Sequence, residues 1–168
     1  MKQVGKFIQM VLVMVLKTLK NQHSSESSAQ ASLPMGGFAL GSSFQFSKRS
    51  LKNLRGVHPD LVTVMYRALE CTTVDFVIIE GLRTVERQRK LVAEGASTTM
   101  NSRHLTGHAV DIVPLIGGKV RWDWPLYEVL AVAVKKAASE LEVMIKWGGD
   151  WTTFKDGPHF ELDRNYYK

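Results

Sequence analysis

The sequence predicts an α+β domain in which a small, mainly antiparallel sheet carries helices packed against one face. Two helical repeats of apolar residues support this prediction, together with short, β-branched apolar segments that lie before and after the longest predicted helix. The chain has 168 residues, of which 45% are hydrophobic and 23% are charged, so it can form one ordinary core. We therefore expect a single folded domain over residues 46–168.

The first predicted helix covers residues 59–71. Pro59 is well placed at the first helical position, where no backbone N–H is needed. The apolar residues that recur at helical spacing are Leu61, Val64, Met65, Ala68 and Leu69. Cys71 ends this pattern and is expected in the core. As the single cysteine, it cannot form an internal disulfide.

A central strand is predicted at residues 74–79, because this segment is short, apolar and rich in β-branched residues. The strand is expected to deliver Arg83 to the edge of the candidate functional site. Thr84 can cap a helix that runs to Ala93 and is closed by Gly95.

The next strand is predicted at residues 109–113 and is expected to stop at Pro114. A turn follows at residues 116–119, and a long helix begins within residues 122–125. The buried stripe of this helix is predicted to consist of Leu126, Val129, Leu130, Ala133, Val134, Ala137 and Leu141.

The last part of the chain is predicted to contain two more strands. Residues 143–147 form the first, and the glycine-rich residues 148–151 turn the chain after it. The final strand can start at His159 but not run through Pro158, which lacks an N–H.

Two imidazoles and one carboxylate have the composition of a metal site. His104 and Asp111 are seven residues apart, so in one straight strand they would point to opposite faces. Gly107 supplies the bend that lets both reach the same point, and His159 should bring the third ligand. Two histidines and one carboxylate are a standard ligand set for catalytic zinc, and they leave a fourth position for water.

A general base is also needed, and Asp156, three residues before His159 across a tight turn, is the candidate. Glu161 is a rival, but it shares a strand face with His159, which favours a supporting or structural role. His108 is also at a plausible ligand spacing from Asp111, although a supporting or solvent-facing role is favoured. Ser102 has two open roles: binding a substrate carboxylate, or shaping the loop.

These residues resemble the M15 zinc peptidases, which include D-Ala-D-Ala carboxypeptidases, dipeptidases and L-alanyl-D-glutamate endopeptidases of phage endolysins and bacterial autolysins. Residues 102–111 fit the pattern Ser-x-His-x-x-Gly-x-Ala-x-Asp, and residues 156–159 fit acid-x-x-His. Gly-Leu-Arg-Thr at 81–84 fits the family's arginine motif. Residues 46–50 and 148–151 resemble the phage-type members.

The resemblance implies a hedgehog/DD-peptidase-like fold in which His104, Asp111 and His159 bind one catalytic zinc ion. It further implies that Asp156 is the base and that Arg83 binds substrate and stabilises the oxyanion. An aspartate in the base position resembles the endolysin branch.

The function implied is an L-alanyl-D-glutamate endopeptidase that degrades peptidoglycan stem peptides, made in the cytoplasm and exported or released at host lysis. A D-alanyl-D-alanine carboxypeptidase remains an alternative, as does a zinc-containing wall-binding module without catalysis.

The N-terminal residues 1–20 form an apolar segment that lies outside this resemblance. Its apolar run, residues 7–16, is about half the ~20 residues that a membrane-spanning helix needs. A cleaved signal, a signal-arrest segment, membrane contact and a translation start at Met35 all stay open. Residues 21–45 have the composition of a flexible linker.

The chain is basic, with 22 Lys and Arg against 16 Asp and Glu, a net charge of +6. A basic surface favours polyanions such as the phosphate-rich bacterial envelope. No basic cluster interleaved with aromatic residues stands out, so nucleic acid is not expected as a partner. We expect a monomer.

Overall fold

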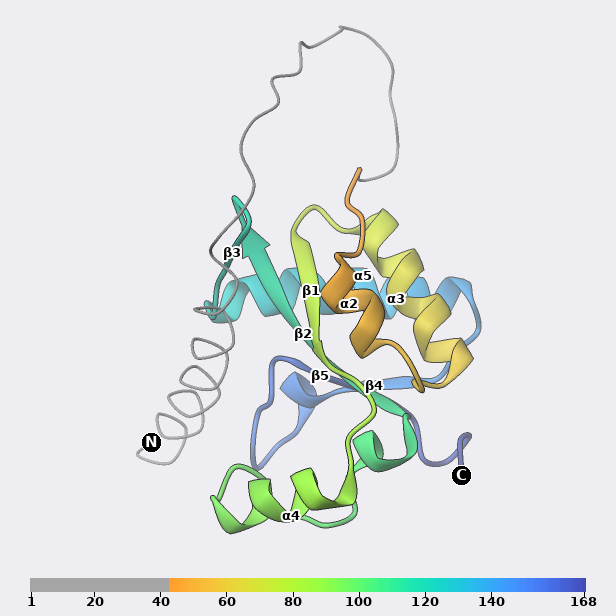
Figure 1. Cartoon of the computed structure of the whole chain (residues 1–168). Helices are drawn as coiled ribbons and strands as arrows, with labels where there is room; N and C mark the ends of the chain where they lie inside the picture. Colours follow the sequence, from red (N-terminus) through yellow and green to blue (C-terminus); the bar gives the residue numbers. More distant parts are fainter. Residues whose placement is uncertain (1–42) are drawn as a thin grey trace, which may run out of the picture. The chain divides into compact units, whose positions relative to one another are not determined.

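The structure is a computed structural model and describes residues 43–168. This part of the chain falls into two compact units: residues up to Val85 together with Asn101–Lys168, and the segment Glu86–Met100. The elements, labelled in Figure 1, are α2 (Lys48–Asn53), α3 (Pro59–Cys71), β1 (Asp75–Glu80), α4 (Val85–Ala93), η1 (Arg103–Thr106), β2 (Ala109–Ile116), β3 (Lys119–Val120), α5 (Trp124–Glu140), β4 (Ile145–Trp147), η2 (Gly148–Asp150) and β5 (His159–Leu162).

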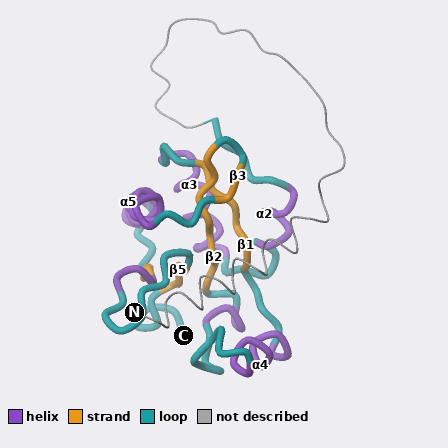
Figure 2. The backbone as a smooth tube through the Cα atoms, turned by 90° about the vertical axis from the view of Figure 1, so that its left-hand side faces the viewer, coloured by secondary structure: helices purple, strands orange, loops and turns teal. Residues whose placement is uncertain are grey.

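The larger unit contains an antiparallel sheet of five strands in the order β1-β2-β5-β4, with β3 paired to β2. Helices α3 and α5 pack against each other, and Figure 1 shows α5 crossing behind β1 and β2. The predicted fold class is therefore confirmed. In Figure 2, β2 extends beyond β5 toward its hairpin with β3.

The pairing of β2 with β5 separates the core from the polar face of the sheet. Val110 lies opposite Phe160, and both are fully buried in the hydrophobic core that α3 and α5 share. Side chains alternate along a strand, so the next pair, Asp111 and His159, points to the other face. The two strands thus place a carboxylate and an imidazole side by side on firm backbone.

Helix α3 occupies the predicted residues. His58 caps it by accepting a hydrogen bond from the Asp60 backbone N–H at 3.3 Å, and all five apolar residues of the predicted stripe are buried. Cys71 is only half-buried, so its placement in the core was wrong. It is the last residue of the helix, where the chain turns away toward Thr72.

Helix α5 begins where expected, with Asp123 as N-cap and proline in its first turn, but its predicted stripe was partly wrong. Val129 and Leu141 are 38% and 37% exposed. The buried residues of this helix are Tyr127, Leu130, Ala131, Ala133, Val134, Ala137 and Ala138. The buried side is rotated toward small alanines, which allow the two helices to approach closely.

Strand β2 does not stop at Pro114, as the sequence predicted, but continues to Ile116. Pro114 lies opposite Phe76 of β1, while its carbonyl accepts a hydrogen bond from Arg121 on the other side. In an antiparallel strand the N–H and C=O of one residue point to the same side. The missing N–H of Pro114 therefore faces away from β1 and leaves that ladder intact. Gly117 and Gly118 both have positive φ, which matches the expected two-residue hairpin turn.

Strand β4 is shorter than the predicted 143–147. Glu142 adopts a φ of 56°, and the Val143 N–H bonds to the Ala138 carbonyl, which closes α5 and delays the strand to Ile145. Strand β5 starts at His159 as predicted.

The smaller unit consists of most of α4 and the loop after it. Gln88 is fully buried and donates hydrogen bonds from Nε2 to Ser97 Oγ at 2.8 Å and to the Thr99 carbonyl at 2.6 Å. One side chain therefore ties the loop back onto its helix.

The apolar segment 1–20 and residues 21–42 of the predicted linker lie outside the described residues. Within residues 43–168, no helix is both long enough and apolar enough to cross a membrane.

Candidate metal centre

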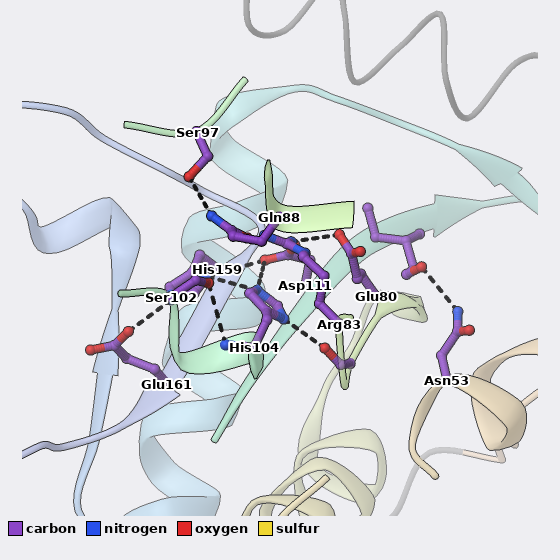
Figure 3. A network of polar contacts seen from close by, with 12 residues as sticks. Asn53, Glu80, Arg83, Gln88, Ser97, Ser102, His104, Asp111, His159 and Glu161 are labelled. Atoms are coloured by element: carbon purple, nitrogen blue, oxygen red, sulfur yellow. Dashed lines mark hydrogen bonds and ion pairs between the residues drawn. The ribbon is translucent and has the colours of Figure 1, made fainter. Parts of the chain in front are cut away.

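Three side chains from three separate segments meet on the polar face of the sheet. His104 comes from η1, Asp111 from β2 and His159 from β5, and Figure 3 shows them pointing toward one another. His104 Nε2 lies 3.3 Å from Asp111 Oδ1 and 3.3 Å from His159 Nδ1, and His159 Nδ1 lies 3.2 Å from Asp111 Oδ1. The three atoms form a nearly equilateral triangle.

The size of this triangle fits a metal ion. A tetrahedral zinc ion with ligands at about 2.0–2.1 Å holds its ligand atoms about 3.3–3.4 Å apart. All three measured separations lie within about 0.2 Å of that value. His104 and His159 are almost fully enclosed, while Asp111 retains 16% of its side-chain exposure. The group can therefore hold one ion.

Hydrogen bonds on the far side of each imidazole fix which nitrogen faces the cluster. His104 Nδ1 lies 2.8 Å from the Gly81 carbonyl, which can only accept, so Nδ1 carries the proton and Nε2 offers its lone pair. His159 Nε2 lies 3.1 Å from Glu161 Oε2, so this ring offers Nδ1. Such outer contacts orient the imidazoles of metal sites. Glu161 thus contacts the far side of His159, the arrangement that its spacing favoured.

Gly107 makes the predicted bend between His104 and β2. Its φ is 71°, in the left-handed region, and a Cβ on it would lie 2.2 Å from the Gly56 carbonyl oxygen. No other residue fits there. Ser102 caps η1 by accepting a hydrogen bond from the His104 N–H at 3.4 Å, a contact that shapes the loop.

Asp111 lies against both imidazoles of the cluster. Burial raises the pKa of its carboxyl group, but His104 and His159, which in their protonated forms attract and hydrogen-bond the carboxylate, outweigh burial and hold the pKa well below its usual value. Asp111 is therefore ionised at neutral pH, as a metal ligand must be. Arg83 Nη2 lies 3.6 Å from its second oxygen, Oδ2, so the structure brings Arg83 to the site edge as predicted.

Asp156 lies in the loop before β5, and its pKa is affected by the charged groups of the cluster. Burial and the charge of Asp111 raise the pKa of its carboxyl group to about 6, against the lowering effects of His159, His104 and Arg83. The loop is held by a hydrogen bond from the Asp156 N–H to the Gly148 carbonyl at 2.9 Å. A Cβ on Gly148 would lie 2.9 Å from the Cβ of Asp156 and 3.1 Å from that of His159. The Cβ atoms of Asp156 and His159 therefore both lie next to Gly148, which has no side chain to displace them.

Two further residues complete the picture. His108 lies outside the cluster, and its Nδ1 contacts Thr106 Oγ1 at 2.9 Å.

Tyr127 could not be identified from the sequence because it falls outside the expected stripe of α5. Its hydroxyl is enclosed and has no hydrogen-bond partner among the described residues. Burial and the charges of Asp156 and Asp111 raise its pKa.

A cluster of two histidines and one carboxylate on a small antiparallel sheet, beside an aspartate of raised pKa and an arginine, is the arrangement of a metallopeptidase. The fold and the site thus define the class of enzyme.

Known proteins place the chain within that class. Residues 42–167 match the family model described as phage L-alanyl-D-glutamate peptidase. The L-alanyl-D-glutamate peptidase of Escherichia phage T5 is 38% identical over 129 residues, covering 74% of this chain and 93% of that protein. The L-alanyl-D-glutamate peptidase of Listeria phage A118 is 34% identical over 125 residues, covering 73% of this chain and 43% of that protein.

The crystal structure of the Serratia marcescens L-Ala D-Glu endopeptidase ChiX is similar with a TM-score of 0.70 and 53% identity, covering 73% of this chain and 92% of that one. The chain belongs to the phage L-alanyl-D-glutamate peptidase family. The resemblance to M15 peptidases seen in the sequence is confirmed.

Proposed function

We propose that this protein is a zinc-dependent endopeptidase that hydrolyses the L-Ala–D-Glu bond of peptidoglycan stem peptides. The observation that carries the proposal is the triangle of His104 Nε2, Asp111 Oδ1 and His159 Nδ1, with both imidazoles oriented to offer lone pairs. The L-Ala–D-Glu bond is proposed because the phage relatives and ChiX are named for cleaving it.

The three ligands would hold zinc, which supplies a water of lowered pKa and a Lewis acid for the scissile carbonyl. Asp156 takes the proton from the attacking water, because its pKa of about 6 leaves it ionised yet basic at neutral pH. It then returns the proton to the leaving amine of D-Glu. Arg83 stabilises the oxyanion that develops on the carbonyl, and its Nη2, 3.6 Å from Asp111 Oδ2, supports this role.

The decisive experiment is amine release from purified peptidoglycan, with and without a chelator, followed by mass identification of the fragments. We expect chelator-sensitive release of whole stem peptides from muramoyl-L-alanine, with activity restored by zinc. Loss of a terminal D-Ala alone would identify a D,D-carboxypeptidase instead. Binding of peptidoglycan without any amine release would identify a non-catalytic wall-binding module.

A variant separates the roles of base and ligand. Asp156→Ala should lower hydrolysis by about 10²- to 10⁴-fold, the usual contribution of a general base, while zinc content stays at one ion per chain. His104→Ala should lose both. Retained activity in Asp156→Ala would refute the assignment of the base.

The site of action follows from the substrate. An enzyme with this specificity works on the cell wall, and the basic surface of the chain suits that anionic envelope. The export route and membrane contact through residues 7–16 remain predictions from sequence.

A further inference from the structure

The end of strand β1 is irregular and is held in place by contacts from α2. The pairing of β1 with β2 shifts register between Ile78 and Glu80, so that Glu80 comes to lie opposite Asp111. Asn53, the last residue of α2, donates hydrogen bonds from Nδ2 to the carbonyls of Ile78 at 2.8 Å and Ile79 at 3.0 Å. This irregular stretch of β1 is therefore fixed from α2, as the Asn53 contact in Figure 3 shows.

The fixed end of β1 places Glu80 against Arg83. Glu80 Oε2 lies 2.6 Å from Arg83 Nη2, and Figure 3 shows the pair beside Asp111. The side chains of Arg83 and Glu80 are only 8% and 19% exposed, so water screens this pair poorly. The same nitrogen lies 3.6 Å from Asp111 Oδ2, which is beyond hydrogen-bond distance.

Arg83 Nη2 thus lies between two carboxylates, with a short ion pair to Glu80 and a longer one to Asp111. An arginine side chain has several rotatable bonds, and the short contact with Glu80 restrains its guanidinium against the anion on its other side. That anion is Asp111, whose other oxygen belongs to the ligand triangle. A guanidinium drawn onto Asp111 would compete for the ligand and leave the position where the oxyanion forms.

We propose that Glu80 is a positioning residue, which keeps Arg83 from a closer contact with Asp111 and holds it toward the developing oxyanion. The inference rests on the proposed function, because it needs a peptidase reaction in which Arg83 takes part. Glu80 acts on the reaction only through Arg83. Its removal should therefore affect the chemical step and not the binding of metal.

A double-mutant cycle tests this directly, using full-length zinc-loaded enzyme under single-turnover conditions on a soluble muramoyl-peptide substrate. Glu80→Gln should lower the rate constant of cleavage by about tenfold, a part of the 10²- to 10³-fold that loss of one oxyanion donor costs. The substrate concentration at half-maximal rate and the zinc content should change less than twofold. Arg83→Lys should be slower than Glu80→Gln.

The double variant gives the sharpest result. If Glu80 works through Arg83, Glu80→Gln costs little once Arg83 has been changed, so the double variant should be no more than about twofold slower than Arg83→Lys. Multiplied effects of the two substitutions would overturn the proposal. So would a Glu80→Gln enzyme that cleaves at the wild-type rate.

The chain offers a matched control in the exposed pair of Arg67 and Glu140, whose Nε and Oε2 are 2.7 Å apart. Glu140→Gln removes an ion pair of similar length far from the cluster, and it should leave cleavage within about twofold of wild type. Glu80→Asp serves where Glu80→Gln does not fold. It keeps the charge but is one methylene shorter, and it too should lower the rate constant without loss of zinc.

Failure of this inference is distinct from failure of the proposed function. If wild-type enzyme does not cleave the L-Ala–D-Glu bond, the function is refuted and this proposal with it. If wild type cleaves while Glu80→Gln loses zinc, Glu80 is a structural residue of the metal site, and the positioning role is refuted alone.

Discussion

At the scale of single residues, the site is defined by how its ionisable groups perturb one another. Asp111 and Asp156 are both partly buried, yet the pKa of Asp111 falls and that of Asp156 rises to about 6. The difference arises because His104 and His159, in their protonated forms, lower the pKa of Asp111, whereas burial and the charge of Asp111 dominate at Asp156. Under the proposed function, the two carboxylates would thereby take different tasks, Asp111 as ligand and Asp156 as base.

This difference predicts the acid side of the pH profile. A general base works only when ionised, so kcat/KM should fall as the pH drops through the pKa of Asp156, at about 6. A bound cation lowers that pKa further, so the midpoint should lie at or below pH 6. Rates from pH 4 to 8 check this, with zinc content measured at each point. A flat profile down to pH 4 with zinc retained would contradict the assignment.

Tyr127 predicts an effect on stability. An enclosed hydroxyl without a partner in the described part of the chain is costly, at about 1–3 kcal/mol. Tyr127→Phe keeps the ring that packs against Gly157 and removes only that hydroxyl. We expect the free energy of unfolding to rise by about 1 kcal/mol in denaturant titrations. Tyr66→Phe, at an exposed ring, is the control and should change nothing measurable.

At the scale of elements, the turn after β4 sets the position of the base. A Cβ on Gly148 would lie 2.5 Å from the Asp156 carbonyl oxygen, too close for any real contact. Gly148→Ala should push the 156–159 loop outward and lower kcat at least tenfold, because small displacements of catalytic groups cost large factors in rate. Kinetics on the zinc-loaded variant check this, and Thr152→Ala, at an exposed position of the same loop, should behave as wild type. An active Gly148→Ala enzyme would show that the loop can shift without harm.

The same scale shows which elements could be predicted from sequence. Helix α3 could be predicted to the residue, because proline marks its start and its apolar stripe has a single solution. Helix α5 could not, because apolar residues surround it and only packing against α3 selects the face with Ala131 and Ala138. The continuation of β2 beyond Pro114 could not be predicted for a related reason, because whether a strand tolerates proline depends on the strands that pair with it.

At the scale of the whole molecule, the metal centre joins parts of the chain that are far apart in sequence. Its ligands lie on η1, β2 and β5, and a bound ion would connect all three. The motifs predicted which side chains meet, because ligand type and spacing restrict the choice. They could not predict the ring nitrogens used, which depend on Gly81 and Glu161 and hence on the folded arrangement.

Because a bound ion would join η1, β2 and β5, we expect zinc to stabilise the folded chain. An ion that binds only the folded chain adds about 2.7 kcal/mol at a concentration 100 times its Kd. Tm should therefore rise with zinc and fall with chelator, and His159→Ala should abolish the dependence. Calorimetry across a zinc series checks this, and a Tm independent of zinc in the wild type would contradict it.

The unlike orientation of the two imidazoles has a mechanical consequence. His159 turns Nδ1, the ring nitrogen nearer its own backbone, toward the cluster, whereas His104 turns the more distant Nε2. A bound ion would therefore lie closer to the backbone of β5 than to that of η1. Its position would follow the sheet more closely than the loop that carries His104.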